Sequence, residues 1–186
     1  TYVIRHGRPA SSWGGQDEDP GLDAEGRAQA EVVAQEILAL PDSERPRRVV
    51  SSPLRRCRET AQSLAEALGV EIQIDPRVGE IPTPAALSSA ERPEWLRQAF
   101  GGRWDQVAGD LDYVAWTQSV AQALTEHAGA AVFSHFVALN AAVSAATGDP
   151  QVAAFRPDHC SLTVFDVDGD RLILARKGRE AHSQVL

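Results

Sequence analysis

The chain has 186 residues, a formal net charge of −8 at pH 7 and 43% hydrophobic residues. This length is typical of one domain with its own core. The negative charge argues against a nucleic-acid partner, and no apolar run approaches the roughly 18 residues of a membrane span. The two cysteines, Cys57 and Cys160, are far apart and form no CxxC motif, which favours a reduced, cytoplasmic location.

The first patterned stretch is residues 1–9, TYVIRHGRP. Its apolar residues, 2–4, predict a buried strand. The strand ends in Arg5 and His6, whose polar side chains are poorly explained by packing, and then in Gly7, which lets the backbone turn or approach a ligand closely. Because open α/β sheets bind ligands beyond the carboxyl ends of their strands, we expect Arg5 and His6 to lie in a functional site.

Strands and helices alternate along the rest of the chain. This alternation predicts an α/β fold, a three-layer α/β/α sandwich whose mostly parallel sheet has an antiparallel edge. We expect helices at 23–40, 52–68, 111–127 and 137–147, strands at 48–52, 70–74 and 130–134, and a terminal hairpin of strands 161–167 and 171–176.

Several local features follow from the pattern. We expect Asp23 to cap the first helix, and Pro53 to occupy the first position of the second. Residues 177–186 are polar and are expected to be loosely held. The face of the first helix that is expected to be buried consists of Ala28, Val32, Val33, Ile37 and Leu40, and that of the second of Cys57, Ala61, Leu64, Ala65 and Leu68.

The pattern weakens between residues 85 and 109, where Trp95, Phe100 and Trp104 stand among Arg, Gly and Pro. We interpret this stretch as a short-helix insertion that caps the substrate site within a single domain of residues 1–186. The two tryptophans belong either to the core or to a lid over the ligand.

Three of the expected strands end in polar residues, namely Arg5-His6, Ser51-Ser52 and Ser134-His135. The next helix adds three arginines in its first turn, Arg55, Arg56 and Arg58. Cations are unfavourable at a helix N-terminus, unless an anion binds there to the exposed N–H groups. A phosphate dianion would satisfy all of these donors, so we expect a phosphate site at this edge.

Glu80 follows the third expected strand. A phosphate nearby disfavours the ionised carboxylate, so a carboxyl group at this place suits a general acid that protonates a leaving oxygen. Glu59, Glu91 and Glu94 are alternative candidates, and Glu80 is favoured over them.

At this point the residues resemble the histidine phosphatase superfamily, the phosphoglycerate-mutase-like proteins. Arg5-His6-Gly7 looks like the family signature. Residues 20–26, PGLDAEG, are similar to its Pro-Leu-Thr-x-x-Gly stretch, and residues 52–61, SPLRRCRETA, to its Ser-x-Leu-x-Arg-Ala-x-Gln-Thr-Ala helix start. Glu80 falls where the family has its acid, and Ser134-His135 where it has its second histidine.

The resemblance implies phosphoryl transfer through the enzyme. His6 would accept the phosphoryl group, and Glu80 would protonate the leaving group and then help water to attack. Arg5, Arg56 and His135 would bind the phosphate oxygens. It implies no metal and no organic cofactor, and the expected partner is a small phosphorylated substrate.

Three positions depart from the family pattern. Phe136 follows the second histidine, where the family usually has Gly. Residues 81–84, Ile-Pro-Thr-Pro, replace an aromatic-Glu-Gly segment, and Ser12 stands where many members have Asn. These differences leave the transfer residues in place and leave the substrate class open.

Three functions are compatible with the sequence. A phosphatase acting on phosphomonoesters or phosphohistidine ranks first, ahead of a phosphoglycerate mutase-type phosphoryl transferase. A non-catalytic phosphate-binding module has only Phe136 in its favour. The pair His159-Cys160 hints at a metal, but without further ligands it does not make a zinc site. The physiological substrate and the oligomeric state stay open.

Overall fold

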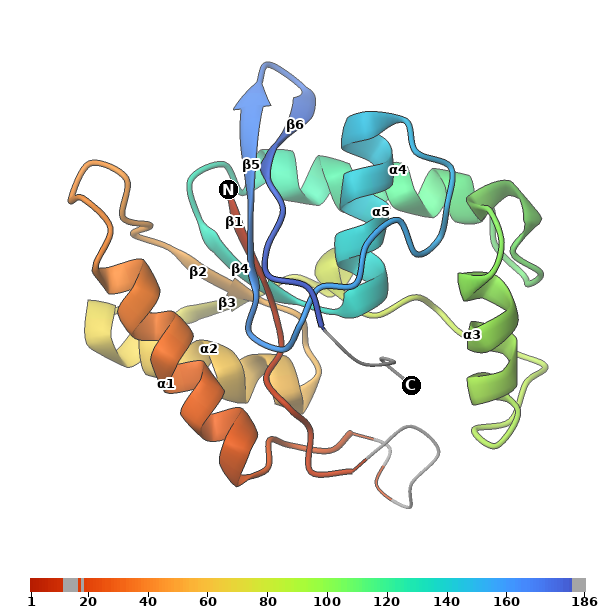
Figure 1. The fold of residues 1–186 in the computed structure, drawn as a ribbon, viewed down its shortest axis with the longest axis horizontal. Coiled ribbons are helices and arrows are strands. Elements are labelled where there is room, and N and C mark those ends of the chain that lie inside the picture. Colours follow the sequence, from red (N-terminus) through yellow and green to blue (C-terminus); the bar gives the residue numbers. More distant parts are fainter. Residues whose placement is uncertain (12–16, 18, 182–186) are drawn as a thin grey trace.

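The computed structural model of the chain describes residues 1–11, 17 and 19–181 (Figure 1). In these ranges the strands are β1 (Tyr2–Arg5), β2 (Val49–Ser51), β3 (Ile72–Ile74), β4 (Ala131–Ser134), β5 (Leu162–Asp168) and β6 (Arg171–Arg176). The helices are α1 (Ala24–Leu38), α2 (Arg55–Leu68), α3 (Arg92–Phe100), α4 (Tyr113–Glu126) and α5 (Phe136–Thr147), with short 3-10 helices η1 (Pro76–Val78) and η2 (Trp104–Gln106).

The described strands form one sheet in the order β3-β2-β4-β1-β5-β6. The first four strands along the chain are parallel, whereas β5 runs antiparallel to both β1 and β6. This arrangement confirms the predicted α/β fold with an antiparallel edge. In Figure 1, α1 and α2 lie on one side of the sheet, and α4 and α5 lie on the other.

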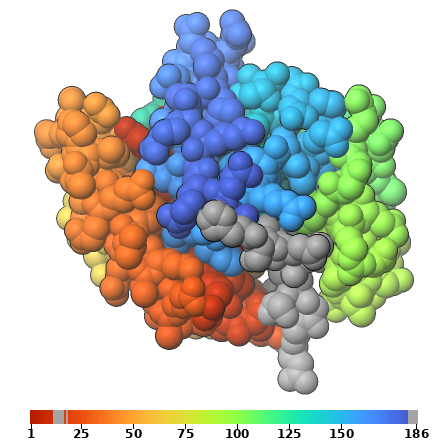
Figure 2. Space-filling view, in the orientation of Figure 1, coloured from red at the N-terminus to blue at the C-terminus, as the bar shows by residue number. Residues whose placement is uncertain are grey.

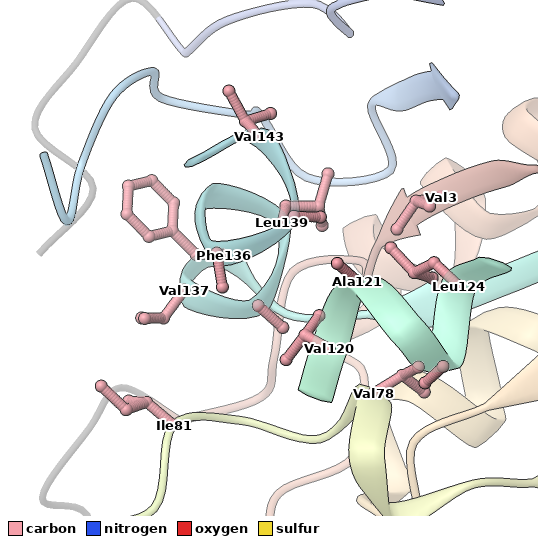
Figure 3. Close-up of a cluster of buried hydrophobic side chains, with 14 of the residues drawn as sticks. Val3, Val78, Ile81, Val120, Ala121, Leu124, Phe136, Val137, Leu139 and Val143 are labelled. Carbon is pink, nitrogen blue, oxygen red and sulfur yellow. The ribbon is translucent and has the colours of Figure 1, made fainter. Parts of the chain in front are cut away.

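Side chains of the central strands alternate between the two faces, as the pleat of a strand requires. Val3 and Val132 belong to the apolar cluster beneath α4 and α5. Ile4 and Phe133 belong to the cluster beneath α1 and α2. Figure 3 shows part of the first cluster, in which Val3 of β1 lies near Leu124 of α4. Each helical layer is therefore held by its own apolar core.

The ends of α1 and α2 follow local sequence rules. Asp23 caps α1 as predicted, because its Oδ1 accepts a hydrogen bond from the backbone N–H of Gly26 at 2.7 Å. Gly69 ends α2 in the left-handed region, at φ +65°. The expected start of α2 at Pro53 is wrong, since the helix begins at Arg55 after a turn in which Leu54 N–H donates to Ser52 Oγ at 3.3 Å.

Two predicted core positions of α1 are wrong. Ala28 is exposed, and Val32 is 68% exposed. The helix instead turns a face of small residues inward, and Val33 and Ile37 are its larger buried side chains. The spacing of residues 26, 30, 33, 34 and 37 fits the helical period better than the predicted set does.

The end of the described chain is not loose, contrary to expectation. Asp158 N–H donates to the carbonyl of Arg179 at 2.9 Å, and Ala181 N–H donates to the carbonyl of Arg156 at 2.9 Å. Residues 182–186 of the predicted tail lie outside the described ranges. The paired segment therefore supports the loop that precedes β5.

The insertion forms α3 and η2, which confirms a short-helix segment. In Figure 2 it makes up much of the green surface along one flank of the molecule. Trp95 and Trp104 are 8% and 4% exposed and pack in the same cluster as α4 and α5, so both are core residues rather than a lid. No helix among the described residues is both long and apolar enough to cross a bilayer.

Gly26→Ala should destabilise the fold, because an added Cβ would lie 2.1 Å from the carbonyl oxygen of Arg8. Overpacking against backbone costs about 1–3 kcal/mol. Gly101→Ala is a matched control, since its nearest new contact would be an ordinary 3.7 Å and its φ is −82°. Urea unfolding should show the loss for Gly26→Ala only. Equal stability of the two variants would contradict this close approach.

Candidate active site

The pairing of β1 with β4 brings two histidines together. Arg5 lies opposite Ser134 in the register, and the backbone N–H of His6 donates to the Ser134 carbonyl at 3.0 Å. The rings of His6 and His135 follow these strand ends, with centroids 5.3 Å apart. Their residues are only 2% and 0% exposed.

The tautomer of His6 is set by its own loop. Nδ1 lies 2.8 Å from the carbonyl oxygen of Gly7, which can only accept, so Nδ1 carries the hydrogen and Nε2 carries the lone pair. Burial lowers the pKa of His6 well below its usual value, and the nearby guanidinium groups of Arg56 and Arg5 lower it further. The ring is therefore neutral and available as a nucleophile at neutral pH.

The loop after β1 packs closely against α1 and is hydrogen-bonded to α2. A Cβ on Gly7 would lie 2.6 Å from the carbonyl oxygen of Gly26 in α1, so only glycine permits this approach. Gly7 N–H donates to Thr60 Oγ1 at 2.9 Å, and that hydroxyl donates to the Arg56 carbonyl at 2.6 Å. Thr60, to which the sequence analysis gave no separate role, thus links His6 to the first turn of α2.

Of the three arginines expected from α2, the structure brings only Arg56 into the site. Its residue is 7% exposed, and Nη2 lies 3.1 Å from His135 Nδ1. Arg55 pairs with Glu59 at 2.7 Å on the surface, and Arg58 is exposed. Arg55 and Arg58 therefore belong to a solvent-exposed face of α2 and not to the site.

Arg5 reaches the site from the strand end. Its Nη1 donates to the carbonyl of Pro157 at 2.8 Å, and burial lowers its pKa to about 10, so it stays cationic at neutral pH. Within the described ranges, the buried Nε atoms of Arg5 and Arg56 have no hydrogen-bond partner. Buried donors are almost always paired, so these two indicate a place for an acceptor.

Of the candidate acids, Glu80 is the one that lies beside His135 and Arg56. Its Oε2 lies 3.6 Å from His135 Nδ1 and 4.0 Å from Arg56 Nη2, and its side chain is 5% exposed. Ser134 Oγ donates to the Val78 carbonyl at 2.7 Å and so fixes the segment that leads to Glu80. The alternatives lie elsewhere: Glu59 pairs with Arg55, Glu91 with Ser88 and Glu94 with Arg97.

His135 has both ring nitrogens engaged. Arg56 can only donate, so Nδ1 accepts, and Nε2 then donates to Ser52 Oγ at 2.8 Å. Burial, followed by the charges of Arg56, Arg5 and Arg92, lowers its pKa well below the usual value. Cys57 Sγ lies 3.3 Å from Nε2, but burial raises the pKa of this thiol, so it remains protonated.

Phe136 occupies the first position of α5 and does not distort it. The guanidinium carbon of Arg5 lies 5.4 Å from the Phe136 ring centroid, within the range of a cation–π contact. Phe136 also packs against Phe100 of α3, with ring centroids 5.3 Å apart. Phe136, which stands in place of the usual glycine, therefore provides an aromatic surface against which Arg5 packs.

Sequence reasoning missed Arg92 as a site residue. It begins α3, and its Nε donates to Thr83 Oγ1. Burial lowers its pKa, with Glu80 raising it and Arg56 lowering it, so its guanidinium lies within electrostatic reach of both. The insertion shows no periodicity that would have singled out Arg92. Ser12, another predicted departure, lies outside the described residues.

The assembled site is cationic and organised around a neutral imidazole. Arg56 Nη2 lies 4.0 Å from Glu80 Oε2, and the charge of Glu80 also acts on Arg5 and Arg92. Three guanidinium groups around this carboxylate suit an anion that carries two charges. Among the described residues, no group of three or more His, Cys, Asp or Glu side chains could hold a metal ion. Nucleophilic attack by His6 on a bound phosphate ester is the chemistry that this arrangement favours.

Known proteins resemble this chain along most of its length. The family model of the histidine phosphatase superfamily (branch 1) matches residues 1–179. The probable phosphoglycerate mutase GpmB of Escherichia fergusonii is 30% identical, over 89% of this chain and 83% of that protein. The GpmB protein of Serratia proteamaculans is 29% identical over the same shares.

Solved structures share the fold. Phosphoserine phosphatase from Entamoeba histolytica, in complex with 3-phosphoglyceric acid, aligns with a TM-score of 0.75 and 21% identity over 97% of each chain. A mycobacterial glucosyl-3-phosphoglycerate phosphatase aligns with a TM-score of 0.72 and 21% identity, covering 97% of this chain and 98% of that one.

The unfolding free energy should fall as the pH drops below about 6.5, partly because of His6 and His135. Their pKa values are lowered in the folded chain, so below about 6.5 the unfolded chain binds more protons. Their contribution is fully present above that pH and is lost below it. Each can add up to about 1.4 kcal/mol per pH unit to the slope.

Urea unfolding of His6→Gln and of His135→Gln at about pH 7.5, 6 and 5 tests this pH dependence. Each variant should show a shallower decline than the unmodified chain. Identical slopes in all three proteins would show that these imidazoles titrate normally.

Proposed function

The chain belongs to the histidine phosphatase superfamily, and we propose that it hydrolyses phosphomonoesters through a phosphohistidine formed on His6. One observation carries this proposal: a buried neutral imidazole lies beside two buried guanidinium groups whose Nε–H donors lack partners among the described residues. A phosphate ester would supply those acceptors at the position where the lone pair of His6 Nε2 can attack.

In the first half-reaction, His6 Nε2 forms a bond to phosphorus while the ester P–O bond breaks. Arg5 and Arg56 bind the phosphoryl oxygens and neutralise charge in the transition state. His135, 3.1 Å from Arg56 Nη2, can exchange its contacts within the protein for one to the phosphate. Glu80 supplies the proton to the leaving alcohol.

In the second half-reaction, water attacks the phosphohistidine. Glu80, now ionised, takes a proton from the water, the P–N bond breaks, and the electron pair returns to His6 Nε2. The products are inorganic phosphate, the neutral imidazole and a protonated Glu80. The cycle balances without an external cofactor.

Arg92 extends the proposal to the substrate class. It begins α3 in the insertion, and its guanidinium interacts electrostatically with both Glu80 and Arg56. Two structural neighbours are enzymes for phosphoserine and glucosyl-3-phosphoglycerate, esters that also carry a carboxyl group. We propose that Arg92 contacts such a carboxylate, and that the insertion therefore acts as the substrate cap.

Mutase activity is the second candidate, because the sequence relatives are named phosphoglycerate mutases. A mutase would return the phosphoryl group from His6 to another hydroxyl of the substrate. Phosphorus NMR of the products decides between the two, since hydrolysis gives inorganic phosphate and a mutase gives an isomer.

Rapid acid-free quenching during turnover of a phosphate ester should trap an acid-labile, alkali-stable phosphate on the protein. His6→Ala should lose both the trapped phosphate and turnover, by about 10³-fold or more, because the attacking nitrogen is absent. His127→Ala, at the end of α4, is the control for removing an imidazole. Full activity of His6→Ala would rule out this mechanism. Phosphate binding without any turnover would favour a binding module.

Arg92→Gln should raise KM for phosphoserine and 3-phosphoglycerate by about 10-fold or more, because a charge-assisted contact is lost. It should change kcat/KM for p-nitrophenyl phosphate by less than about threefold. The matched control is Arg97→Gln, on the same helix but paired with Glu94 at the surface. If Arg92→Gln reduces activity toward both substrate types equally, Arg92 does not select carboxylates.

A further inference from the structure

A third imidazole, that of His159, lies beside the nucleophile. His159 precedes β5, and its ring centroid is 5.8 Å from that of His6, with the ring planes tilted by 48°. The ring centroid of His135, the residue just before α5, lies 5.3 Å from that of His6. The sequence suggested only a metal for His159, and the described residues form no metal-binding group around it.

The segment that carries His159 is anchored to the end of β1. Arg5 Nη1 donates to the Pro157 carbonyl at 2.8 Å, and the Cys160 N–H donates to the Arg5 carbonyl at 3.1 Å. Arg5 N–H in turn donates to the Ser161 carbonyl at 3.3 Å. These bonds lie on both sides of His159, so the strand that positions the nucleophile also positions this residue.

The backbone next to His159 is strained. Cys160 has a φ of +52°, a left-handed conformation that is unfavourable for a non-glycine residue. Asp158 Oδ1 holds the preceding turn by accepting from the His159 N–H at 2.8 Å. Strain of this kind is common at functional sites, where the surrounding structure maintains an unfavourable geometry.

His159 and His135 have different surroundings. The charges that act on His135 are those of Arg56, Arg5 and Arg92, whereas those that act on His159 are those of Arg5, Asp158, Arg8 and Asp23. The two rings therefore share Arg5 as a charged neighbour and otherwise have different charged groups around them. Both ring nitrogens of His135 have protein partners, but the ring of His159 makes no hydrogen bond to any residue that the structure describes.

The ring of His159 is uncharged at neutral pH. Burial, helped by the Arg5 guanidinium, lowers its pKa to about 4. A neutral imidazole offers one N–H donor and one acceptor. It can therefore add a donor to the site without adding a further positive charge beside Arg5.

We propose that His159 is a phosphate-binding residue, whose ring N–H donates to a phosphoryl oxygen held at His6. The proposal rests on the proposed function, because it takes His6 Nε2 as the place where the phosphoryl group sits. The role is binding alone, and His159 transfers no proton. With it, an uncharged donor joins the guanidinium donors of Arg5 and Arg56 around the phosphoryl group.

Calorimetric titration of the full chain with inorganic phosphate tests this role. His159→Leu keeps the volume but removes the donor, and it should weaken binding by about 10-fold, the loss expected for one hydrogen bond to a charged acceptor. The variants His159→Asn and His159→Gln each retain a side-chain N–H group. The phosphate affinity of the tighter-binding one should stay within about threefold of that of the unmodified chain. Unchanged affinity in His159→Leu would overturn the proposal, as would an equal loss in all three variants.

A second measurement needs no substitution and so does not depend on how a variant folds. The ring nitrogen signals of His159, followed by NMR, should shift when inorganic phosphate is added. Signals that stay unchanged at saturating phosphate would reject the contact.

The two proposals can fail separately. A trapped phosphohistidine together with unchanged phosphate affinity in His159→Leu would reject the role of His159 alone. Weakened phosphate binding in His159→Leu without any phosphohistidine would reject the catalytic proposal and support the binding role.

Discussion

The parallel pairing of β1 with β4 is the constraint on which the site depends. It places Arg5 opposite Ser134, and the hydrogen bond from His6 N–H to the Ser134 carbonyl continues the ladder one residue beyond the strand. A slip of one residue would turn Ile4 and Phe133 out of their apolar cluster, so the core enforces the register. The packing of the sheet thus fixes the separation of His6 and His135, without any contact being needed between the rings.

Burial then determines the chemistry of the groups that the register brings together. It keeps His6 and His135 neutral and leaves Arg5 cationic, with a pKa of about 10. A buried donor without a partner costs about 1–3 kcal/mol, and the Nε–H groups of Arg5 and Arg56 have no partner among the described residues. A phosphate dianion would offset that cost. The same burial that disfavours a protonated nucleophile therefore favours the binding of an anion.

The sequence predicted what depends on periodicity and on strand ends. Alternating patterns located the sheet and the helices, and polar residues after β1 and β4 located His6 and His135. It did not reveal Arg92 or the position of His159, because their places depend on an aperiodic insertion and on a loop anchored by Arg5. The exposure of Val32 was missed for a related reason, since α1 buries small residues that hydrophobicity alone ranks low. Local patterns thus located the site residues that follow strands β1 and β4.

Phe136 connects the site residues at the strand ends to the insertion. Its ring lies 5.4 Å from the Arg5 guanidinium carbon and 5.3 Å from the ring of Phe100 in α3, so it contacts residues of both β1 and α3. A guanidinium loses little by packing on an aromatic face, because its hydrogen-bonding edge stays available to an acceptor. This contact therefore restricts Arg5 without using the donors that phosphate needs. Glycine at this position could not transmit the packing of α3 to Arg5, and we infer that this chain uses Phe136 to hold α3 and Arg5 in a fixed relation.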